Sequence, residues 1–161
     1  MVEKLTLLGV PEAGVAYIPA RPAGVRALLK DLPIRNPADY TFVDLGSGMG
    51  RILFLAAEYA FRRVEGVELA IELHEQACRN IGEYRHFKQR CSQLRSINAD
   101  ACDYRFPNEN LAVFFVAVCS GFDVPRDDFG PRVVLGANRR ADARRISISR
   151  TRKYRVEPVL L

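Results

Sequence analysis

The sequence lacks an apolar run long enough to cross a membrane. Its longest run covers the nine residues from Leu111 to Cys119, whereas a membrane-spanning helix needs about 20 residues. The segment that follows Met1 lacks the apolar core of a secretory signal peptide. We therefore expect a soluble, cytoplasmic protein with no membrane partner.

The sequence also lacks any pair of cysteines with the CxxC spacing. Its four cysteines stand at positions 78, 91, 102 and 119. Scattered cysteines argue against zinc sites and thioredoxin-like redox motifs, so we expect no metal site. Cys78 and Cys119 lie in apolar patterns, where we expect their thiols to pack as small hydrophobic groups.

Low-complexity tracts and internal repeats are absent as well. The 161 residues are 48% hydrophobic and 27% charged, which suits one globular domain with a substantial core. We treat residues 1–161 as a single domain with three parts. These are an N-terminal helical region (1–35), a central core (40–118) and a basic, atypical C-terminal region (119–161).

Positive charge is concentrated in residues 126–155. This segment holds ten Arg or Lys and three Asp, a local net charge of +7, while the rest of the chain has a net charge of −2. A patch of this kind suits a nucleic acid or another anionic partner. The alternative is a solvated basic surface, because the segment lacks the interleaved aromatic residues of a nucleic-acid-binding module.

Helix and strand patterns alternate along the chain. In the first helix Val25, Leu28 and Leu29 fall at i, i+3 and i+4. The continuous apolar run after Asn110 indicates a strand buried on both faces, as in parallel sheets. Alternation with short connections predicts a three-layer α/β fold with a mainly parallel sheet. The predicted helices cover 22–32, 51–59 and about 74–81, and the predicted strands cover 41–45, 64–67, 94–97, 111–118 and 146–149.

A glycine-rich loop, Asp44-Leu45-Gly46-Ser47-Gly48-Met49-Gly50, follows the first predicted strand. In an open α/β sheet, ligands bind at the carboxyl ends of the strands, where this loop lies. Glycine allows the backbone to approach a ligand closely. A dinucleotide-binding loop reads GxGxxG and holds a pyrophosphate. Here the spacing is GxGxG, and the preceding Asp44 suits a ligand with positive groups better than one with two phosphates.

Two further acids follow predicted strands. Glu68 ends the second strand, 18 residues after Gly50, and Asp100 follows the third. From these places Glu68 can accept hydrogen bonds from both ribose hydroxyls, and Asp100 from the exocyclic amine of adenine. Each acid alone is also typical of a helix N-cap or a turn. The glycine loop and both acids, in this order, indicate a nucleoside-type ligand site.

The stretch from Thr41 to Ile81 resembles class I S-adenosylmethionine-dependent methyltransferases, and the similarity extends over about residues 17–118. It is closest to a small bacterial-type group with a D-L-G-S-G-x-G-R loop and a G-V-E strand end. A more distant likeness is to nucleosomal histone-lysine methyltransferases. The resemblance implies a Rossmann-like methyltransferase fold whose core, residues 40–118, binds S-adenosylmethionine. The cofactor-binding residues that it implies are Asp44, Gly46, Ser47, Gly48, Gly50, Glu68 and Asp100.

The acceptor half departs from this family. After the fourth strand, relatives carry an Asn or Asp, a Pro and an aromatic residue, but here the sequence reads Cys119-Ser120-Gly121-Phe122-Asp123. Phe122 is the candidate for the aromatic role and Asp123 for a general base. The fold also looks short at its C-terminus.

The sequence features bear on three candidate functions. We expect methyl transfer to an unidentified acceptor. The alternative is a non-catalytic or partner-dependent cofactor-binding module with a degenerate acceptor site. A nicotinamide-dependent oxidoreductase is disfavoured by the spacing of the glycine loop.

Overall fold

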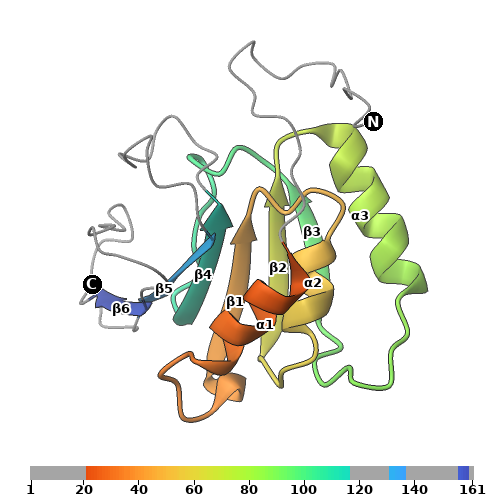
Figure 1. The fold of residues 1–161 in the computed structure, drawn as a ribbon. Coiled ribbons are helices and arrows are strands. Elements are labelled where there is room, and N and C mark those ends of the chain that lie inside the picture. Colours follow the sequence, from red (N-terminus) through yellow and green to blue (C-terminus); the bar gives the residue numbers. More distant parts are fainter. Residues whose placement is uncertain (1–20, 117–130, 137–155, 160–161) are drawn as a thin grey trace.

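One six-stranded sheet organises the chain (Figure 1). The computed structural model describes residues 21–116, 131–136 and 156–159. The strand order is β3-β2-β1-β4-β5-β6; β1 to β4 run parallel, β5 is antiparallel to β4, and β6 is parallel to β5. The strands are β1 (Tyr40–Leu45), β2 (Arg63–Glu68), β3 (Leu94–Asn98), β4 (Asn110–Val116), β5 (Pro131–Gly136) and β6 (Val156–Val159). The predicted α/β fold with a mainly parallel sheet is confirmed.

Three α-helices lie where the sequence predicts them. They are α1 (Pro22–Lys30), α2 (Arg51–Ala56) and α3 (Ile71–Glu83), and a short 3₁₀ helix, η1 (Pro37–Asp39), precedes β1. The predicted helix over 51–59 ends early, because the amides of Glu58 and Tyr59 bond three residues back and turn the chain toward β2. The predicted strand over 146–149 lies outside the described residues. Within the described ranges, no helix is long and apolar enough to span a bilayer.

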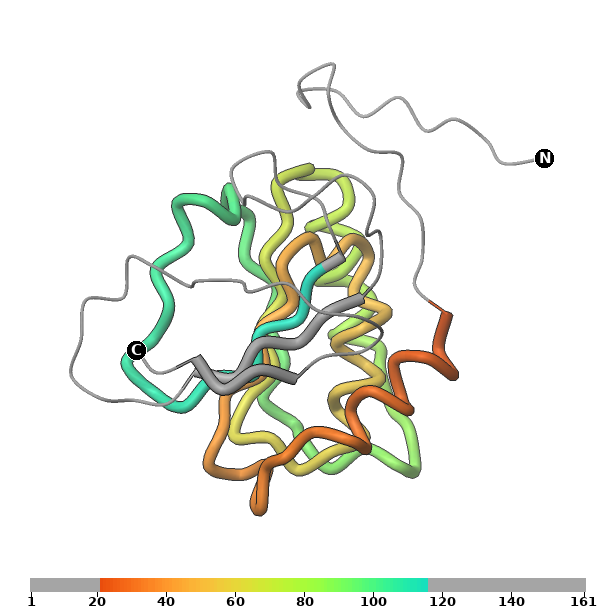
Figure 2. The backbone as a smooth tube through the Cα atoms, turned by 60° about the vertical axis from the view of Figure 1, so that its left-hand side comes forward, coloured from red at the N-terminus to blue at the C-terminus, as the bar shows by residue number. Residues whose placement is uncertain are grey.

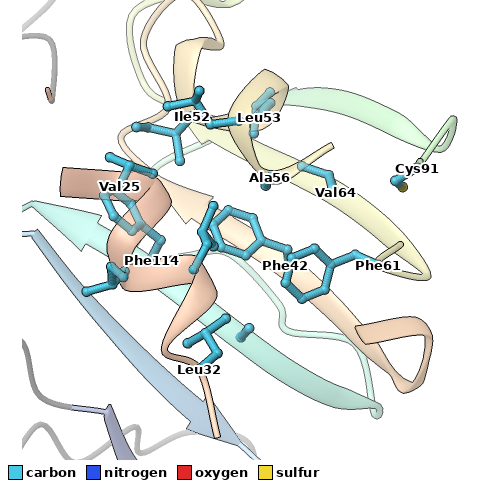
Figure 3. Packing of buried hydrophobic residues seen from close by; sticks show 14 residues of the cluster. Val25, Leu32, Phe42, Ile52, Leu53, Ala56, Phe61, Val64, Cys91 and Phe114 are labelled. Carbon is cyan, nitrogen blue, oxygen red and sulfur yellow. The ribbon is translucent and has the colours of Figure 1, made fainter. Parts of the chain in front are cut away.

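The main core lies between the sheet and the helices (Figure 3). The helical stripe predicted in α1 is confirmed, since Val25, Leu28 and Leu29 are buried. They pack with side chains from α2 and with Phe42 of β1, whose ring centroid lies 5.3 Å from that of Phe61. Removing these side chains from water stabilises the layer by about 25 cal/mol per Å² of apolar surface.

The other face of the sheet is covered by the connection between β3 and β4, residues 99–109. Figure 2 shows this connection on the opposite side of the sheet from α1 and α2. Its Tyr104 and Phe106 pack against buried strand residues such as Val43 and Val113. Within the described residues, the third layer is therefore an irregular segment rather than a helix.

A fully buried carboxylate, Glu65 of β2, faces this connection. Its Oε1 accepts hydrogen bonds from Arg63 Nε at 2.5 Å and Arg95 Nη2 at 2.8 Å, and its Oε2 accepts from the Tyr104 hydroxyl. Burial, followed by the hydrogen bond to Glu65, raises the pKa of Tyr104. Two guanidinium groups thus compensate a charge that would be very costly to bury alone. No local pattern in the sequence predicts this network.

Candidate functional site

The carboxyl ends of β1, β2 and β3 meet at one edge of the sheet (Figure 1). Leu45 at the end of β1 is paired with Val67, and Glu68 at the end of β2 is paired with Asn98. The segments that follow these strands therefore lie side by side. The glycine loop comes from β1, Glu68 ends β2, and Asp100 follows β3, each after the strand expected from the sequence, and the sheet places these three strands next to one another.

The glycine loop adopts a conformation that side chains rarely allow. Gly46, Gly48 and Gly50 have φ angles of 79°, 54° and 90°, in the left-handed region that favours glycine. The Gly50 amide donates to Ser47 O at 3.0 Å, and the Gly46 and Ser47 amides donate to Val67 O at 2.8 and 3.1 Å. The three glycines thus allow a tight turn, which is hydrogen-bonded to the neighbouring strand β2.

A glycine in β2 allows this loop to lie against the sheet. A Cβ on Gly66 would stand 2.6 Å from Ser47 Oγ and 2.9 Å from Leu53 Cδ1, closer than real atoms approach. Gly66 is therefore a site residue that the sequence analysis missed. The signal was present, because a glycine inside a buried strand often marks a close approach by another segment.

Glu68 links the loop to the second strand. Its side chain is buried; Oε2 accepts from the Gly48 amide at 2.8 Å, and Oε1 accepts from the Ala70 amide at 2.9 Å. Each carboxylate oxygen has two lone-pair positions, so each retains one acceptor position. Glu68 can therefore hold the loop and still accept from two hydroxyl groups of a ligand.

Two asparagines fix the backbone around this carboxylate. Asn98 Nδ2 donates to the carbonyls of Glu68 and Leu69 at 2.9 and 3.0 Å, and Asn80 Nδ2 donates to Met49 O at 2.9 Å. Neither residue belongs to a motif that the sequence predicts. A local sequence pattern does not show which side chains bond to the backbone of another element. The only available signal was that Asn98 stands at the end of a predicted strand and Asn80 in a predicted helix.

Asp44 is buried beneath the loop without a complete set of partners. It is 2% exposed, and among the described residues neither its Oδ2 nor the buried Ser47 Oγ has a hydrogen-bond partner. Burial, and next the negative charge of Glu68, raise the pKa of Asp44 well above its ordinary value. Buried polar atoms in native structures are nearly always bonded. These two atoms therefore mark a place where a ligand with donor groups, above all a cation, would be stabilised.

Asp100 lies at the same edge but is exposed. Its Oδ1 accepts from the Cys102 amide at 2.8 Å, which is the turn role that the sequence left open.

The expectation that the Cys78 thiol packs in the interior is wrong. Cys78 is exposed, because α3 buries Leu73 and Ala77 instead.

Several other predictions fall beyond the described residues. Phe122, Asp123 and Cys119 all lie there, and the basic segment 126–155 is described only over 131–136. Their proposed roles stay predictions. Within the described ranges, no group of three or more His, Cys, Asp or Glu side chains is placed to hold a metal ion.

Comparison with known proteins gives structural neighbours alone. No family model and no curated protein matches the sequence. The YcgJ protein from Bacillus subtilis is 13% identical, with a TM-score of 0.46 and coverage of 60% of this chain and 51% of that one. Geranyl diphosphate C-methyltransferase from Streptomyces coelicolor, in complex with S-adenosyl-L-homocysteine, is 21% identical, with a TM-score of 0.44 and coverage of 58% and 44%.

A third neighbour is an RNA methyltransferase from Salinibacter ruber in complex with S-adenosyl-L-homocysteine. It is 19% identical, with a TM-score of 0.45 and coverage of 68% of this chain and 84% of that one. Two of these three neighbours are methyltransferases. The chain spans only about half the length of the first two, and no residue role is transferred from any of them. The likeness to nucleosomal histone-lysine methyltransferases stays a prediction.

Proposed function

We propose that this chain binds S-adenosylmethionine and transfers its methyl group to an acceptor molecule. The observation that carries the proposal is the buried, incompletely bonded Asp44 beneath a glycine loop that is itself held by Glu68. One edge of the sheet thus offers a negative charge, a closely approachable backbone and a second carboxylate. This set of groups suits a nucleoside with a cationic tail.

The chemistry of the ligand fits these groups one by one. The ammonium and sulfonium of S-adenosylmethionine are positive and would offset the charge of Asp44, while the free acceptor positions of Glu68 suit two ribose hydroxyls. We assign to Asp100 the acceptance of a hydrogen bond from the adenine amine. A dinucleotide would instead bring two phosphates toward Asp44 and Glu68, where like charges repel. The three carboxylates therefore favour S-adenosylmethionine over NAD as the ligand.

When bound, S-adenosylmethionine supplies an electrophilic methyl group. The residues of this chain contribute binding and orientation: the glycine loop admits the ligand close to the backbone, and Glu68 fixes the ribose. Holding two reactants in the correct geometry contributes about 7 kcal/mol or more to lowering the barrier. We assign Phe122 to the acceptor side of the site. Asp123 would serve as the base where the acceptor must lose a proton.

The departure of residues 119–123 from the family pattern favours a second candidate, a cofactor-binding module that needs a partner to complete its acceptor site. The two functions share the cofactor site and differ in turnover. Binding of S-adenosylmethionine with no methyl transfer by the isolated chain would support the module.

The test has two stages. Titration calorimetry compares S-adenosylmethionine, S-adenosylhomocysteine and NAD on the purified chain, and we expect the two sulfur ligands to bind and NAD not to bind. Methyl-labelled S-adenosylmethionine is then incubated with RNA, protein and small-molecule fractions, and labelled product in one fraction identifies the acceptor class. Tighter binding of NAD than of S-adenosylmethionine would overturn the proposal.

A further inference from the structure

A row of aromatic rings leads from the interior to solvent at the opposite edge of the sheet from the cofactor site. The segment between α3 and β3, at the lower right of Figure 1, carries Tyr84, His86 and Phe87. The Phe54 and Tyr84 centroids lie 4.4 Å apart, those of Tyr84 and His86 6.2 Å apart, and those of His86 and Phe87 4.6 Å apart. The inner ring is partly buried, while Phe87 is 88% exposed.

Backbone and side-chain bonds hold this segment in place. The amides of Arg90 and Cys91 donate to Ala57 O at 2.8 and 3.1 Å, and the Gln89 amide donates to His86 O at 2.9 Å. The Cys91 side chain is buried. A single exposed phenylalanine on a protein surface is ordinary. Here Phe87 lies tilted against His86 at the end of a row of rings, on a turn that is hydrogen-bonded to the end of α2, so ordering of the backbone on binding costs little.

Positive charge surrounds the exposed rings. Residues 84–95 contain four basic residues and no acidic one. Arg85, Lys88 and Arg90 are exposed, and Lys88 Nζ lies 5.5 Å from the centroid of Phe87. Two acids lie nearby: Glu83 is exposed at the end of α3, and Glu58 is engaged by Arg26, with oxygen-to-nitrogen distances of 3.0 and 2.6 Å. The surface therefore complements an anionic partner.

A hollow of about 790 Å³ opens beside the rings, between the end of α3 and the start of β3. Tyr84, His86, Phe87 and the basic Arg85 and Arg90 all line it. Exposed rings on which bases stack, flanked by cations that contact phosphates, form the usual surface for single-stranded nucleic acid. An acidic peptide would use the cations but would leave the ring faces without a stacking partner.

We propose that the segment Tyr84–Arg90 is a docking surface for single-stranded nucleic acid, whose bases stack on His86 and Phe87 and whose phosphates contact Arg85, Lys88 and Arg90. This surface is separate from the cofactor site. The 13-residue helix α3 connects the two edges of the sheet, and a helix of that length spans about 20 Å. The proposal therefore stands or falls independently of S-adenosylmethionine binding.

Fluorescence anisotropy with the full chain tests the proposal. The probes are a labelled 20-nucleotide single-stranded RNA, the DNA of the same sequence and the corresponding duplex, with heparin as a competitor. We expect the single strands to bind more tightly than the duplex, and the RNA and DNA arms show which sugar is preferred. Phe87→Leu keeps an apolar side chain but removes the ring, and should weaken single-strand binding at least about fivefold, the low end of one base–aromatic stack.

Charge variants distinguish binding at this surface from non-specific attraction of the nucleic acid to the positively charged chain. Lys88→Gln should reduce the slope of log affinity against log salt by about one, whereas Arg35→Gln, an exposed arginine before β1, should leave it unchanged. Because Phe87 is exposed, its variant should melt at the same temperature as the parent chain.

The proposal would be overturned if the chain did not bind single strands, or if Phe87→Leu left single-strand binding unchanged. Loss of all binding in Arg144→Glu with Arg145→Glu, with Phe87→Leu at parental affinity, would move the interaction to the basic segment 126–155 and also overturn it.

Discussion

The backbone amide of Gly48 donates a hydrogen bond to the carboxylate of Glu68 at 2.8 Å. This bond joins the loop after β1 to the acid at the end of β2, although 20 residues separate them in the chain. The group proposed to orient the ribose therefore also sets the shape of the loop that admits the ligand. Changes at Glu68 should alter both at once.

The buried Asp44 predicts a conflict between stability and binding. Its pKa is raised in the folded chain, so the protonated carboxyl is favoured more in the folded state than in the unfolded state. The stability that this contributes is lost as pH rises from about 4 through the raised value and the buried carboxyl becomes charged. Asp44→Asn removes the penalty at neutral pH. We expect its melting temperature to exceed that of the parent by about 2 °C or more at pH 7, while its affinity for S-adenosylmethionine falls.

Melting curves from pH 4 to pH 8 check this prediction. The difference between Asp44→Asn and the parent should grow with pH. The control is Asp39→Asn, at an exposed acid of η1, which should follow the parent. A constant difference across this range would show that the charge of Asp44 carries no such penalty.

Gly66 predicts a steric effect on the loop. In Gly66→Ala the new methyl group would meet Ser47 and Leu53 within 3 Å, so the loop or the strand must shift, at a cost of about 1–3 kcal/mol. Gly82→Ala is the matched control, since nothing lies within 4 Å of its Cβ position and it is in α3. There alanine should stabilise the helix by up to about 1 kcal/mol.

Urea unfolding followed by far-ultraviolet circular dichroism measures both glycine variants, because the chain has no tryptophan. Equal free energies of unfolding for the two variants would contradict the close approach of Ser47 to β2.

The buried Glu65 predicts a large loss of stability. Glu65→Ala leaves Arg63, Arg95 and the Tyr104 hydroxyl without their shared acceptor, and breaking a buried pair from one side costs about 3–5 kcal/mol. The comparison is Arg26→Ala, which removes an exposed ion pair with Glu58 and should have a far smaller effect. Similar losses for both variants, measured by the same unfolding experiment, would refute the structural role of Glu65.

Much of this architecture is readable from the sequence because local patterns determine it. Strands β1 to β4 and helix α1 follow from apolar runs and from a stripe at helical spacing. The gathering of the glycine loop, Glu68 and Asp100 at one edge of the sheet is also predictable, since each follows a parallel strand and parallel strands have their carboxyl ends at the same edge. The C-terminal end of α2 was harder to predict, because the turn after Ala56 depends on bonds that redirect the chain.

Contacts across elements could not be predicted in the same way. Asn98 and Asn80 hold backbone carbonyls from other segments, and no local pattern states which segments these are. Cys78 seemed to share an apolar stripe, but the register of α3 against the sheet turns Leu73 and Ala77 inward instead. Strand β5 (Pro131–Gly136) was not predicted either, because it forms by antiparallel pairing with β4, which is also a contact across elements.

Titration of the folded chain with S-adenosylmethionine, repeated with Glu68→Ala, tests the central claim most directly. Glu72→Ala is the matched control, because Glu72 is an exposed acid in the first turn of α3. We predict that the parent and Glu72→Ala bind S-adenosylmethionine equally and that Glu68→Ala binds at least about tenfold more weakly, the effect of losing about 1.4 kcal/mol. No binding to the folded parent, or equal binding by Glu68→Ala, would contradict the account.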